Sequence, residues 1–322
     1  MKALVQEGYG SPDVLELRDI EMPRVGENEV LVRVHAASVN ALDWHMTRGM
    51  PYFIRLMAGI RAPRDRVRGV DLAGRVDAVG RNVTQFAPGD EVFGGSDGSF
   101  AEYTATKPER LTRKPSGLSY EQASTLYVAA LTALQALRDK ARLQAGQRVL
   151  INGAGGGVGT MAVQIAKWMG AHVTAVTRTE SVDMVRSIGA DEVIDHRSED
   201  FTRRGERYDV IIYNGGNRPF GECRRVLSRN GALVVVGASA GKWLAPVSQL
   251  MGAAVLSLFV SQRIVPFVSK NDRADLEMLA ELAQERHIRP VIDRQFPLGE
   301  AAEAIRYLGT GHARGKVVIT VH

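Results

Sequence analysis

The sequence predicts an α/β protein in which a β-rich domain is interrupted by a domain built on a doubly wound parallel sheet. Three observations support this fold class. The first third of the chain contains short β-branched runs between turn residues, strands and helices alternate from residue 148 to residue 236, and the closing segment has too few elements to form a domain. We therefore expect residues 1–123 and 268–322 to form the β-rich domain and residues 124–267 the inserted domain.

The strands of the β-rich domain are expected where β-branched residues lie between turn signals. Residues 30–34 and 74–79 fit this pattern, and Pro88-Gly89-Asp90 is a turn signal before the strand expected at 91–93. Residues 98–103 then resume extended structure. Four further elements close the chain: a helix at 272–286 with Asp272 as its N-cap, an extended segment at 290–296, a helix at 300–308 and a strand at 316–321.

The inserted domain follows a long helix expected from Tyr120 to Leu137. Alternating strands and helices indicate βαβ units and hence a parallel sheet. The expected strands are 148–152, 172–176, 193–195, 208–213 and 232–236, and the helices between the first of them are 157–169 and 181–188.

Composition indicates a soluble globular protein, with 45% hydrophobic and 24% charged residues among 322. The single cysteine, Cys223, excludes an intramolecular disulfide and fits a reducing compartment. The first residues lack the pattern of a signal peptide, so we expect a cytoplasmic protein. The apolar run 251–260 is only about half as long as a membrane helix, which favours a buried helix or subunit interface over stable membrane insertion.

The net charge of +5 raises the question of a nucleic-acid partner. The arginines cluster only modestly, without Gly/aromatic interleaving or zinc-finger spacing. We therefore expect no nucleic-acid partner. A basic surface also suits an anionic cofactor.

A glycine-rich loop runs from Gly153 to Gly159, between the strand at 148–152 and the helix at 157–169. Its spacing is Ala154-x-Gly156-x-x-Gly159. In this arrangement Gly156 would let the backbone approach a pyrophosphate, Gly159 would let the helix pack on the strand, and the helix N-terminus would face the negative charge. The sequence therefore predicts a dinucleotide site lined by Ala154, Gly156, Gly157, Val158 and Gly159.

The choice of cofactor is read at the end of the next strand. Enzymes that use NAD place an Asp or Glu there for the ribose hydroxyls, whereas this chain has Thr177-Arg178-Thr179. The guanidinium of Arg178 can pair with a 2′-phosphate, so we expect NADPH (NADP⁺). In the alternative, Arg178 is a solvated surface charge and Glu180 or Asp183 holds the ribose.

Several motifs, in order and over nearly the whole chain, resemble the medium-chain dehydrogenase/reductase superfamily, and within it the zinc-independent quinone oxidoreductase and enoyl-reductase branch. The motifs are Met1-Lys2-Ala3, residues 26–32, Ala37-Ser38-Val39-Asn40, Asn40-Ala41-Leu42-Asp43, Gly89-Asp90-Glu91-Val92, Leu131-Thr132-Ala133, the loop 153–159, Gly189-Ala190-Asp191 and Gly315-Lys316-Val317-Val318.

The resemblance implies a GroES-like β-rich catalytic domain, an inserted Rossmann domain and an active site in the cleft between them. It also implies hydride transfer from NADPH to a quinone or an α,β-unsaturated carbonyl, and a homodimer joined through the last strand of the Rossmann sheet. By the same resemblance Asn40 lies near the nicotinamide ribose and Thr132 near the nicotinamide ring. Gly237 and Lys316 complete the expected cofactor-binding residues.

The sequence departs from this family's pattern at three positions. Ser181 stands where many relatives have a lysine that contacts the 2′-phosphate, and His196 stands where a tyrosine often lies on the adenosine side. His45 replaces the usual active-site tyrosine. We still expect Ser181 and His196 to contact the cofactor.

The zinc-dependent branch needs a Cys where Asn40 stands and a His-Glu pair where Val70-Asp71 stands. Neither is present, so we expect no metal. A makeshift zinc site from Asp43, His45 and Asp71 is disfavoured, because catalytic zinc sites favour His and Cys at set spacings. The alternatives are an NADP-dependent alcohol dehydrogenase, with or without zinc, and a non-catalytic NADPH-binding regulatory protein.

The candidate catalytic residues are Asn40, Asp43 and His45. Histidine can donate a proton to an enolate oxygen near neutral pH, and Asp43 could orient the ring of His45. In the alternative, His45 is a hydrogen-bonded helix-surface residue and Asp43 is a local cap or a partner of Arg48. Protonation from water would need neither side chain. The stretch 52–57 is expected to be either a cap that admits a bulky apolar substrate or an ordinary surface helix.

Overall fold

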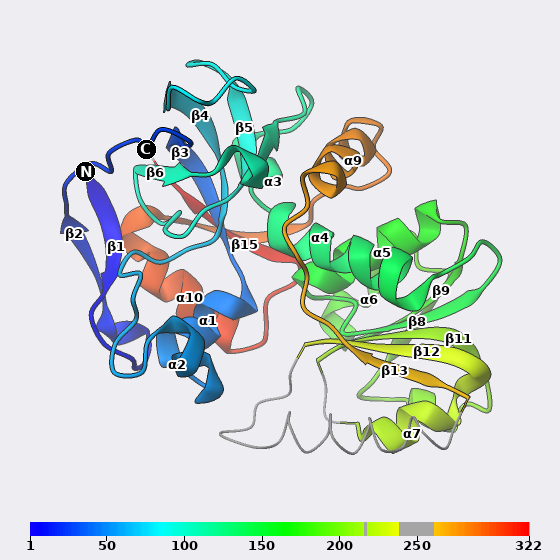
Figure 1. Ribbon diagram of the computed structural model, residues 1–322. Coiled ribbons are helices and arrows are strands. Elements are labelled where there is room, and N and C mark those ends of the chain that lie inside the picture. Colours follow the sequence, from blue (N-terminus) through cyan, green and yellow to red (C-terminus); the bar gives the residue numbers. More distant parts are fainter. Residues whose placement is uncertain (216–217, 238–260, 322) are drawn as a thin grey trace. The chain divides into compact units, whose positions relative to one another are not determined.

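The computed structural model describes residues 1–215, 218–237 and 261–321, and the chain divides into two compact units (Figure 1). The first unit contains residues 1–131, 271–286 and 290–322, and the second contains residues 132–270 and 287–289. The first junction follows Leu131, a few residues beyond the boundary expected at 123. The apolar run 251–260 lies outside the described residues.

The first unit contains most of the β structure. Its elements are β1 (Lys2–Gln6), β2 (Leu15–Asp19), β3 (Val30–Val39), α1 (Ala41–Arg48), α2 (Phe53–Ala58), β4 (Asp71–Val79), β5 (Glu91–Gly95), β6 (Tyr103–Thr106), β7 (Leu111–Arg113), α3 (Tyr120–Ala123), α9 (Arg273–Gln284), β14 (Ile292–Pro297), α10 (Ala301–Gly309) and β15 (Lys316–Thr320). The helix α4 (Tyr127–Gln135) begins in this unit and ends in the second.

One sheet organises the first unit, in the order β14-β15-β3-β4-β5-β7, with β6 also paired to β3. The last strand, β15, pairs antiparallel with β3, and Val317 lies opposite Val39. The end of the chain therefore joins the N-terminal sheet. The aliphatic side chains of β3, β4 and β15 form a buried core with Ala301, Ala304 and Ile305 of α10.

Most predicted elements of this unit are present. The N-cap of α9 is confirmed, because the Asp272 carboxylate accepts hydrogen bonds from the N–H groups of Ala274 and Asp275 at 2.9 and 3.3 Å. The extended segment predicted at 98–103 becomes a regular strand only from Tyr103. The φ angle of Gly98 is +131°, which a regular strand does not accommodate.

The second unit is a parallel sheet with helical crossovers. Its elements are β8 (Arg148–Asn152), α5 (Gly157–Trp168), β9 (His172–Thr177), α6 (Val182–Ser187), β10 (Glu192–Asp195), β11 (Tyr208–Asn214), α7 (Phe220–Arg225), β12 (Leu227–Gly237) and β13 (Arg263–Pro266).

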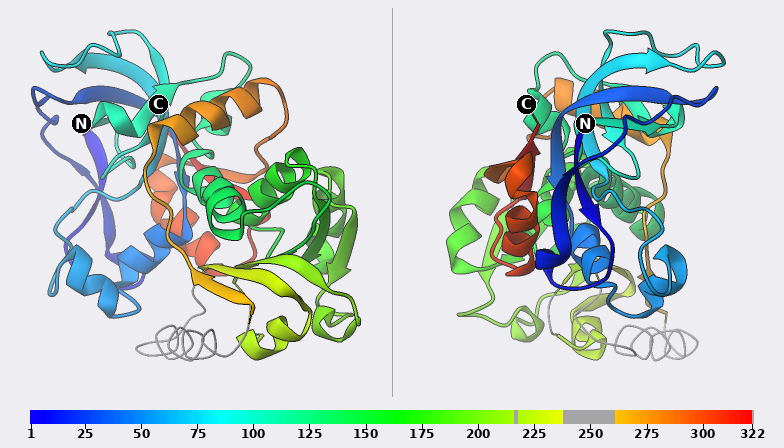
Figure 2. Two further views of the ribbon diagram at one scale, coloured as in Figure 1. Left: turned by 45° about the vertical axis from the view of Figure 1, so that its right-hand side comes forward. Right: turned by 90° about the vertical axis from the view of Figure 1, so that its left-hand side faces the viewer.

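The strand order of this sheet is β10-β9-β8-β11-β12-β13, and every pairing is parallel. The chain proceeds outward from β8 to β10 and then crosses to β11 on the other side of β8. Figures 1 and 2 show α5 and α7 on opposite faces of the sheet. The predicted α/β class and doubly wound parallel sheet are thus confirmed, and the carboxyl ends of β8 and β11 meet where the strand order reverses.

The prediction of one long helix from Tyr120 to Leu137 is wrong in one respect, because the helix is interrupted after α3. The hydroxyls of Ser124 and Thr125 donate to the carbonyls of Glu121 and Gln122 at 2.8 and 2.7 Å. Such bonds compete with the helical pattern of the backbone. After α4 the chain makes a π-helical turn at Ala136–Ala141.

In the parts of the chain that the structure describes, no helix combines the length and the hydropathy that a membrane span requires.

Candidate active site

The first group of candidate residues lies where β3 ends and α1 begins. Asn40 is the N-cap of α1 and has an extended backbone conformation. Its N–H donates to the Asp43 carboxylate at 2.7 Å, which is the return contact of a capping box. The sequence Asn40-Ala41-Leu42-Asp43 therefore fixes the start of the helix and, with it, the position of the Asn40 side chain.

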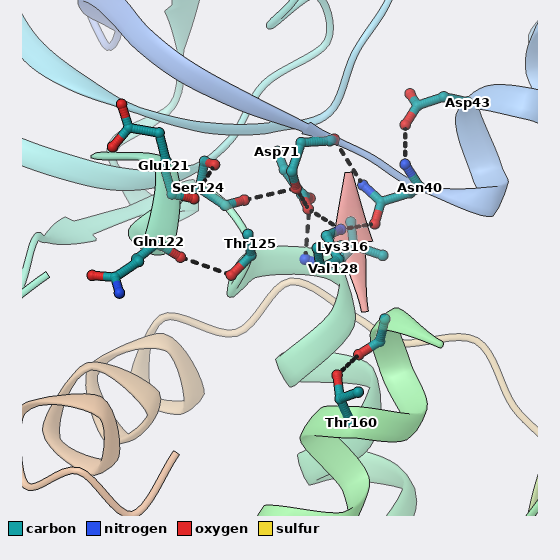
Figure 3. Close-up of polar contacts among 12 residues, drawn as sticks. Asn40, Asp43, Asp71, Glu121, Gln122, Ser124, Thr125, Val128, Thr160 and Lys316 are labelled. Carbon is teal, nitrogen blue, oxygen red and sulfur yellow. Dashed lines mark hydrogen bonds and ion pairs between the residues drawn. The ribbon is translucent and has the colours of Figure 1, made fainter. Parts of the chain in front are cut away.

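The amide of Asn40 is held by a buried lysine. The Lys316 ammonium, on β15, donates to Asn40 Oδ1 at 2.6 Å and to Asp71 Oδ2 at 3.0 Å (Figure 3). Lys316 is 2% exposed. Because the amide oxygen faces the ammonium, the NH₂ group of Asn40 is left as a hydrogen-bond donor. Asn40 Nδ2 lies 3.4 Å from the Ser38 carbonyl oxygen, a long contact.

Asp71, at the start of β4, is the anion of this cluster. Its carboxylate accepts hydrogen bonds from the Ser38 hydroxyl at 2.7 Å and from the Val128 N–H at 3.1 Å, in addition to the Lys316 contact (Figure 3). Asp71 is fully buried. A buried carboxylate needs such compensation, and here it comes from one cation and two neutral donors.

Asp43 and His45 do not form the pair that was considered from the sequence. The Asp43 carboxylate caps α1, whereas His45 Nδ1 lies 3.0 Å from the Met50 carbonyl oxygen. A carbonyl only accepts, so Nδ1 carries the proton and Nε2 of the neutral ring is an acceptor. Of the two interpretations considered from the sequence, the structure shows the second, in which Asp43 is a local cap and His45 is hydrogen-bonded elsewhere.

Burial shifts the pKa values of both residues. It raises the pKa of Asp43 to about 7, and the neighbouring Asp71 carboxylate acts in the same direction. Burial lowers the pKa of His45 below its ordinary value, which favours the neutral ring. Both shifts disfavour the charged forms of these side chains.

The positions at which the zinc-dependent branch carries its ligands are Asn40, Val70 and Asp71 in this chain. Asp71 is held by the Lys316 ammonium at 3.0 Å. Within residues 1–215, 218–237 and 261–321, no group of three or more His, Cys, Asp or Glu side chains is arranged to hold a metal ion.

The glycine loop of the second unit leaves β8 and enters α5. Gly153 has a φ of +80°. A Cβ on Gly159 would lie 2.1 Å from the Gly153 carbonyl oxygen, so a side chain cannot be placed there without moving backbone. A Cβ on Gly156 would meet its nearest atom, the Gly153 carbonyl oxygen, at 3.6 Å, which is an ordinary van der Waals contact. Gly157 and Val158 form the first turn of α5, whose N–H groups have no partner within the helix.

A pocket of about 340 Å³ lies at the carboxyl edge of the same sheet. Its wall is formed at the ends of β8, β9 and β10 by Asn152, Val176 and His196. The rest of the wall consists of residues 199–201 and Arg218. The structure thus brings His196 to the same edge as the loop. Ala154 is fully buried there, and Gly237 ends β12 opposite Asn214.

The end of β9 carries the residues expected to choose the cofactor. Thr177 is buried and Arg178 is half-buried. Arg178 has no ion-pair partner among the residues that the structure describes. Glu180 pairs with Arg197 at 2.6 Å, and the fully exposed Asp183 pairs with Arg186 at 3.2 Å. The two carboxylates considered for the ribose are therefore both engaged by arginines.

The remaining candidate residues are Ser181 and Thr132. Ser181 is fully buried, and its hydroxyl has no hydrogen-bond partner in the described part of the chain. Its Oγ would lie 3.0 Å from a Cβ on Gly155, so it faces the glycine loop. The Thr132 hydroxyl donates to Ser269 at 2.9 Å within the second unit.

The sequence reasoning missed the roles of Asp71 and Ser38. Asp71 had been considered only as a zinc ligand, and Ser38 only as part of a motif. The available signal was the carboxylate itself, since an Asp inside the apolar run Val70-Asp71-Leu72-Ala73 must find partners when buried.

Two family models and several known proteins are similar to this chain. The alcohol dehydrogenase GroES-like domain model matches residues 26–116, and the zinc-binding dehydrogenase model matches residues 188–319. The chain is 33% identical over 337 residues to the chloroplastic quinone-oxidoreductase QR1 of Triphysaria versicolor, covering 99% of this chain and 98% of the relative.

Two further proteins are similar over the whole chain. An NADPH-dependent alkenal/one oxidoreductase of Arabidopsis thaliana is 33% identical over 334 residues, covering 99% of this chain and 79% of that protein. The solved structure of the quinone oxidoreductase from Coxiella burnetii has a TM-score of 0.88 at 30% identity, covering 100% of this chain and 99% of that one. The chain therefore belongs to the medium-chain dehydrogenase/reductase superfamily and is an oxidoreductase.

Proposed function

We propose that this protein is an NADPH-dependent, metal-independent reductase that transfers a hydride to a quinone or to the β-carbon of an α,β-unsaturated carbonyl compound. The observation that carries the proposal is the Asn40–Lys316–Asp71 cluster. A neutral amide, Asn40, stands at one position where a zinc enzyme of this family would need a metal ligand, and the carboxylate at another, Asp71, is paired with the Lys316 ammonium. The names of the quinone and alkenal/one relatives support the same reaction class.

The residues of the second unit fit a dinucleotide. The backbone at Gly156, the first turn of α5 and the pocket at the carboxyl edge of the sheet would together hold a pyrophosphate and an adenosine. Ala154, Gly157, Val158 and Gly159 would hold the pyrophosphate, and His196 would line the adenosine side. Ser181 and Gly237 lie at the same edge of the fold.

Arg178 supports NADPH over NADH. Its guanidinium has no carboxylate partner among the described residues, and the nearby carboxylates of Glu180 and Asp183 are already paired. A 2′-phosphate would supply the missing counter-ion through charge-assisted hydrogen bonds. Thr177, just before it, would contact the ribose end of the same cofactor.

When bound, NADPH supplies the hydride. The residues of this chain would orient the cofactor and the substrate. Asn40 is held with its NH₂ group as a donor and would bind an oxygen of the nicotinamide ribose or of the substrate. Lys316 would act through Asn40 as a positioning residue, because its ammonium is buried and already bonded. Thr132 would lie on the nicotinamide side.

We propose that water supplies the second proton. His45 carries its ring proton on Nδ1, which donates a hydrogen bond to the Met50 carbonyl oxygen. Burial lowers the pKa of His45. A neutral ring in this tautomer offers an acceptor at Nε2, not a donor. Asp43 is committed to the capping contact. Neither side chain is placed as the proton donor of the reaction.

The substrate is proposed to be apolar and planar. The helix α2 exposes Phe53 and Leu56, and Ile60 follows it in the same exposed state. Exposed apolar side chains close together in the chain are typical of a contact surface for an apolar ligand. Replacing Phe53 and Leu56 by alanine should raise KM for a bulky enone more than for a small one, and an unchanged ratio would remove this assignment.

We also propose a homodimer formed through the edge strand β13, and a cytoplasmic location. Among the described strands β13 is the last of its sheet, and the outer backbone groups of such an edge strand can pair with another strand. The buried, unpaired thiol of Cys223 fits a reducing compartment. Light scattering on the purified protein would test the dimer.

The proposed activity is tested by following NADPH and NADH oxidation with quinones, enones and aldehydes. We expect turnover of quinones or enones with a preference for NADPH. Tight NADPH binding without oxidation by any acceptor would favour a non-catalytic regulatory protein, and turnover of alcohols would favour an alcohol dehydrogenase.

A further inference from the structure

A second pocket, lined by three arginines, lies at the opposite edge of the parallel sheet from the glycine loop. Arg207 precedes β11, Arg224 and Arg225 end α7 just before β12, and Gln262 precedes β13. Segments that lead into parallel strands lie at the amino edge of the sheet, whereas the glycine loop leaves its carboxyl edge. The pocket has a volume of about 420 Å³, and Gly221 completes its lining.

Hydrogen bonds hold two of these arginines in place. Arg224 Nε donates to Gln262 Oε1 at 2.9 Å, and Gln262 Nε2 donates in turn to the Leu227 carbonyl oxygen at 3.0 Å. Arg207 donates from one terminal nitrogen to the carbonyl oxygens of Leu227 and Arg225, at 3.2 and 3.3 Å. Among the residues that the structure describes, each of these two guanidinium groups donates from one nitrogen only.

The pocket has space for a ligand beside these groups. A Cβ built on Gly221 would meet no atom within 4 Å, so the surface of α7 is open at this point. Arg225, the third arginine, is exposed and borders the same space. Three guanidinium groups thus surround an open volume at one edge of the sheet.

The carboxylates near this pocket are engaged elsewhere. Glu206 pairs with Arg148 at 2.7 Å, and Glu222 pairs with Arg218 at 3.7 Å. The Asp209 carboxylate accepts the N–H of Arg148 at 3.0 Å. The segment 238–260 contains no Asp or Glu in its sequence. No carboxylate lines the pocket, and no ion pair of Arg207, Arg224 or Arg225 occurs among the described residues.

We propose that this pocket binds the phosphate group of a small anionic molecule, at a site separate from the proposed cofactor site. Arginine forks match the geometry of phosphate oxygens, and charge-assisted hydrogen bonds of this kind are about twice as strong as neutral ones. The contacts of Arg207 with the Arg225 and Leu227 carbonyls, and of Arg224 with Gln262, account for one nitrogen of each side chain. They do not explain why three cations converge on an open space without a counter-ion.

The test is calorimetric titration of the full-length protein with inorganic pyrophosphate in the presence of saturating NADP⁺, which occupies the glycine loop. We expect the wild type to bind pyrophosphate under these conditions. The variant R207Q/R224Q should bind it at least about tenfold more weakly, because two charge-assisted contacts are lost. The matched control is R229Q, which changes an exposed arginine of β12 outside the pocket and should bind as the wild type does.

Two results would overturn the proposal: NADP⁺ abolishes all pyrophosphate binding, or R207Q/R224Q binds as tightly as R229Q. Binding to vesicles of phosphatidic acid without binding of pyrophosphate would also overturn it. If R207Q/R224Q unfolds, R225Q replaces it, since that exposed side chain anchors nothing in the described structure. If NADP⁺ does not bind, the proposed function fails, but the comparison of these variants still decides the second site.

Discussion

The ammonium of Lys316 lies 3.0 Å from a carboxylate oxygen of Asp71, and both side chains are almost completely buried. The two residues lie on β15 and β4, which are the neighbours of β3 on either side. The ion pair therefore crosses the end of β3, where Ser38 and Asn40 add their own contacts. This relationship fixes the N-terminus of α1 to the sheet.

Replacing Lys316 by methionine leaves the Asp71 charge buried without its cation. Breaking a buried pair in this way costs about 3–5 kcal/mol of unfolding free energy, which urea denaturation would measure. The double variant K316M/D71N removes both charges and should recover most of that loss. The kcat/KM should be low in K316M and should stay low in the double variant, because in both the Asn40 amide has lost its 2.6 Å partner. If the unfolding free energy of K316M were within about 1 kcal/mol of the wild-type value, Asp71 would not be left as a buried charge without a partner.

Gly156 and Gly159 should respond differently to alanine. In G159A the new Cβ would lie 2.1 Å from the Gly153 carbonyl oxygen, so the variant should lose about 1–3 kcal/mol of stability or more. In G156A the nearest atom is at 3.6 Å, so thermal stability should be unchanged while NADPH affinity falls. Thermal melting and fluorescence titration of NADPH separate the two effects. If G156A bound NADPH as the wild type does, the pyrophosphate would not lie above this glycine.

Arg178→Gln should weaken the preference for NADPH. The variant loses the proposed partner of the 2′-phosphate, so kcat/KM with NADPH should fall by about tenfold or more, given about 1.5–3 kcal/mol for a charge-assisted contact. Activity with NADH should be nearly unchanged. The matched control is R197Q, since Arg197 is paired with Glu180 at 2.6 Å. Equal losses with both cofactors would point to a structural role for Arg178.

Asp43 should make stability depend on pH. Burial raises its pKa from the ordinary value of 3.8 to about 7, so between these values the folded state binds more protons than the unfolded state. The unfolding free energy should therefore fall as pH rises through this window and level off above it. In D43N the amide oxygen can still accept from the Asn40 N–H, but the charge is gone. Urea denaturation should show that D43N gains stability relative to the wild type from pH 5 to pH 8. If the two proteins differed in unfolding free energy by the same amount at both pH values, the raised pKa of Asp43 would be contradicted.

Local patterns in the sequence predict the sheet of the second unit well. The strand at 148–152 was expected with the bounds that β8 has, and the loop after it enters α5 at Gly157 as expected. A fully buried parallel strand is a continuous apolar run, which makes it easy to locate. The edge strand β13 and the short helix α7 were not expected, because Arg263–Pro266 and Phe220–Arg225 have no such periodic pattern.

The chemistry of the candidate site was less predictable. Asn40 and Asp43 were identified from their motif, but their contacts depend on residues far away in the chain. Lys316 is separated from Asn40 by 276 positions, and only the pairing of β15 with β3 brings them together. The role of His45 could not be read from its neighbours either, since its partner is a backbone carbonyl in the loop after α1. Such contacts belong to the tertiary fold and leave no local signal.

We propose that this oxidoreductase reduces quinones or enones with NADPH and without a metal. The most direct measurement is the rate of NADPH oxidation with a quinone and an enone, before and after dialysis against a chelator, with the metal content of the same sample determined. We expect turnover that the chelator does not change, and no stoichiometric zinc. Stoichiometric zinc together with chelator-sensitive oxidation of an alcohol would contradict the account.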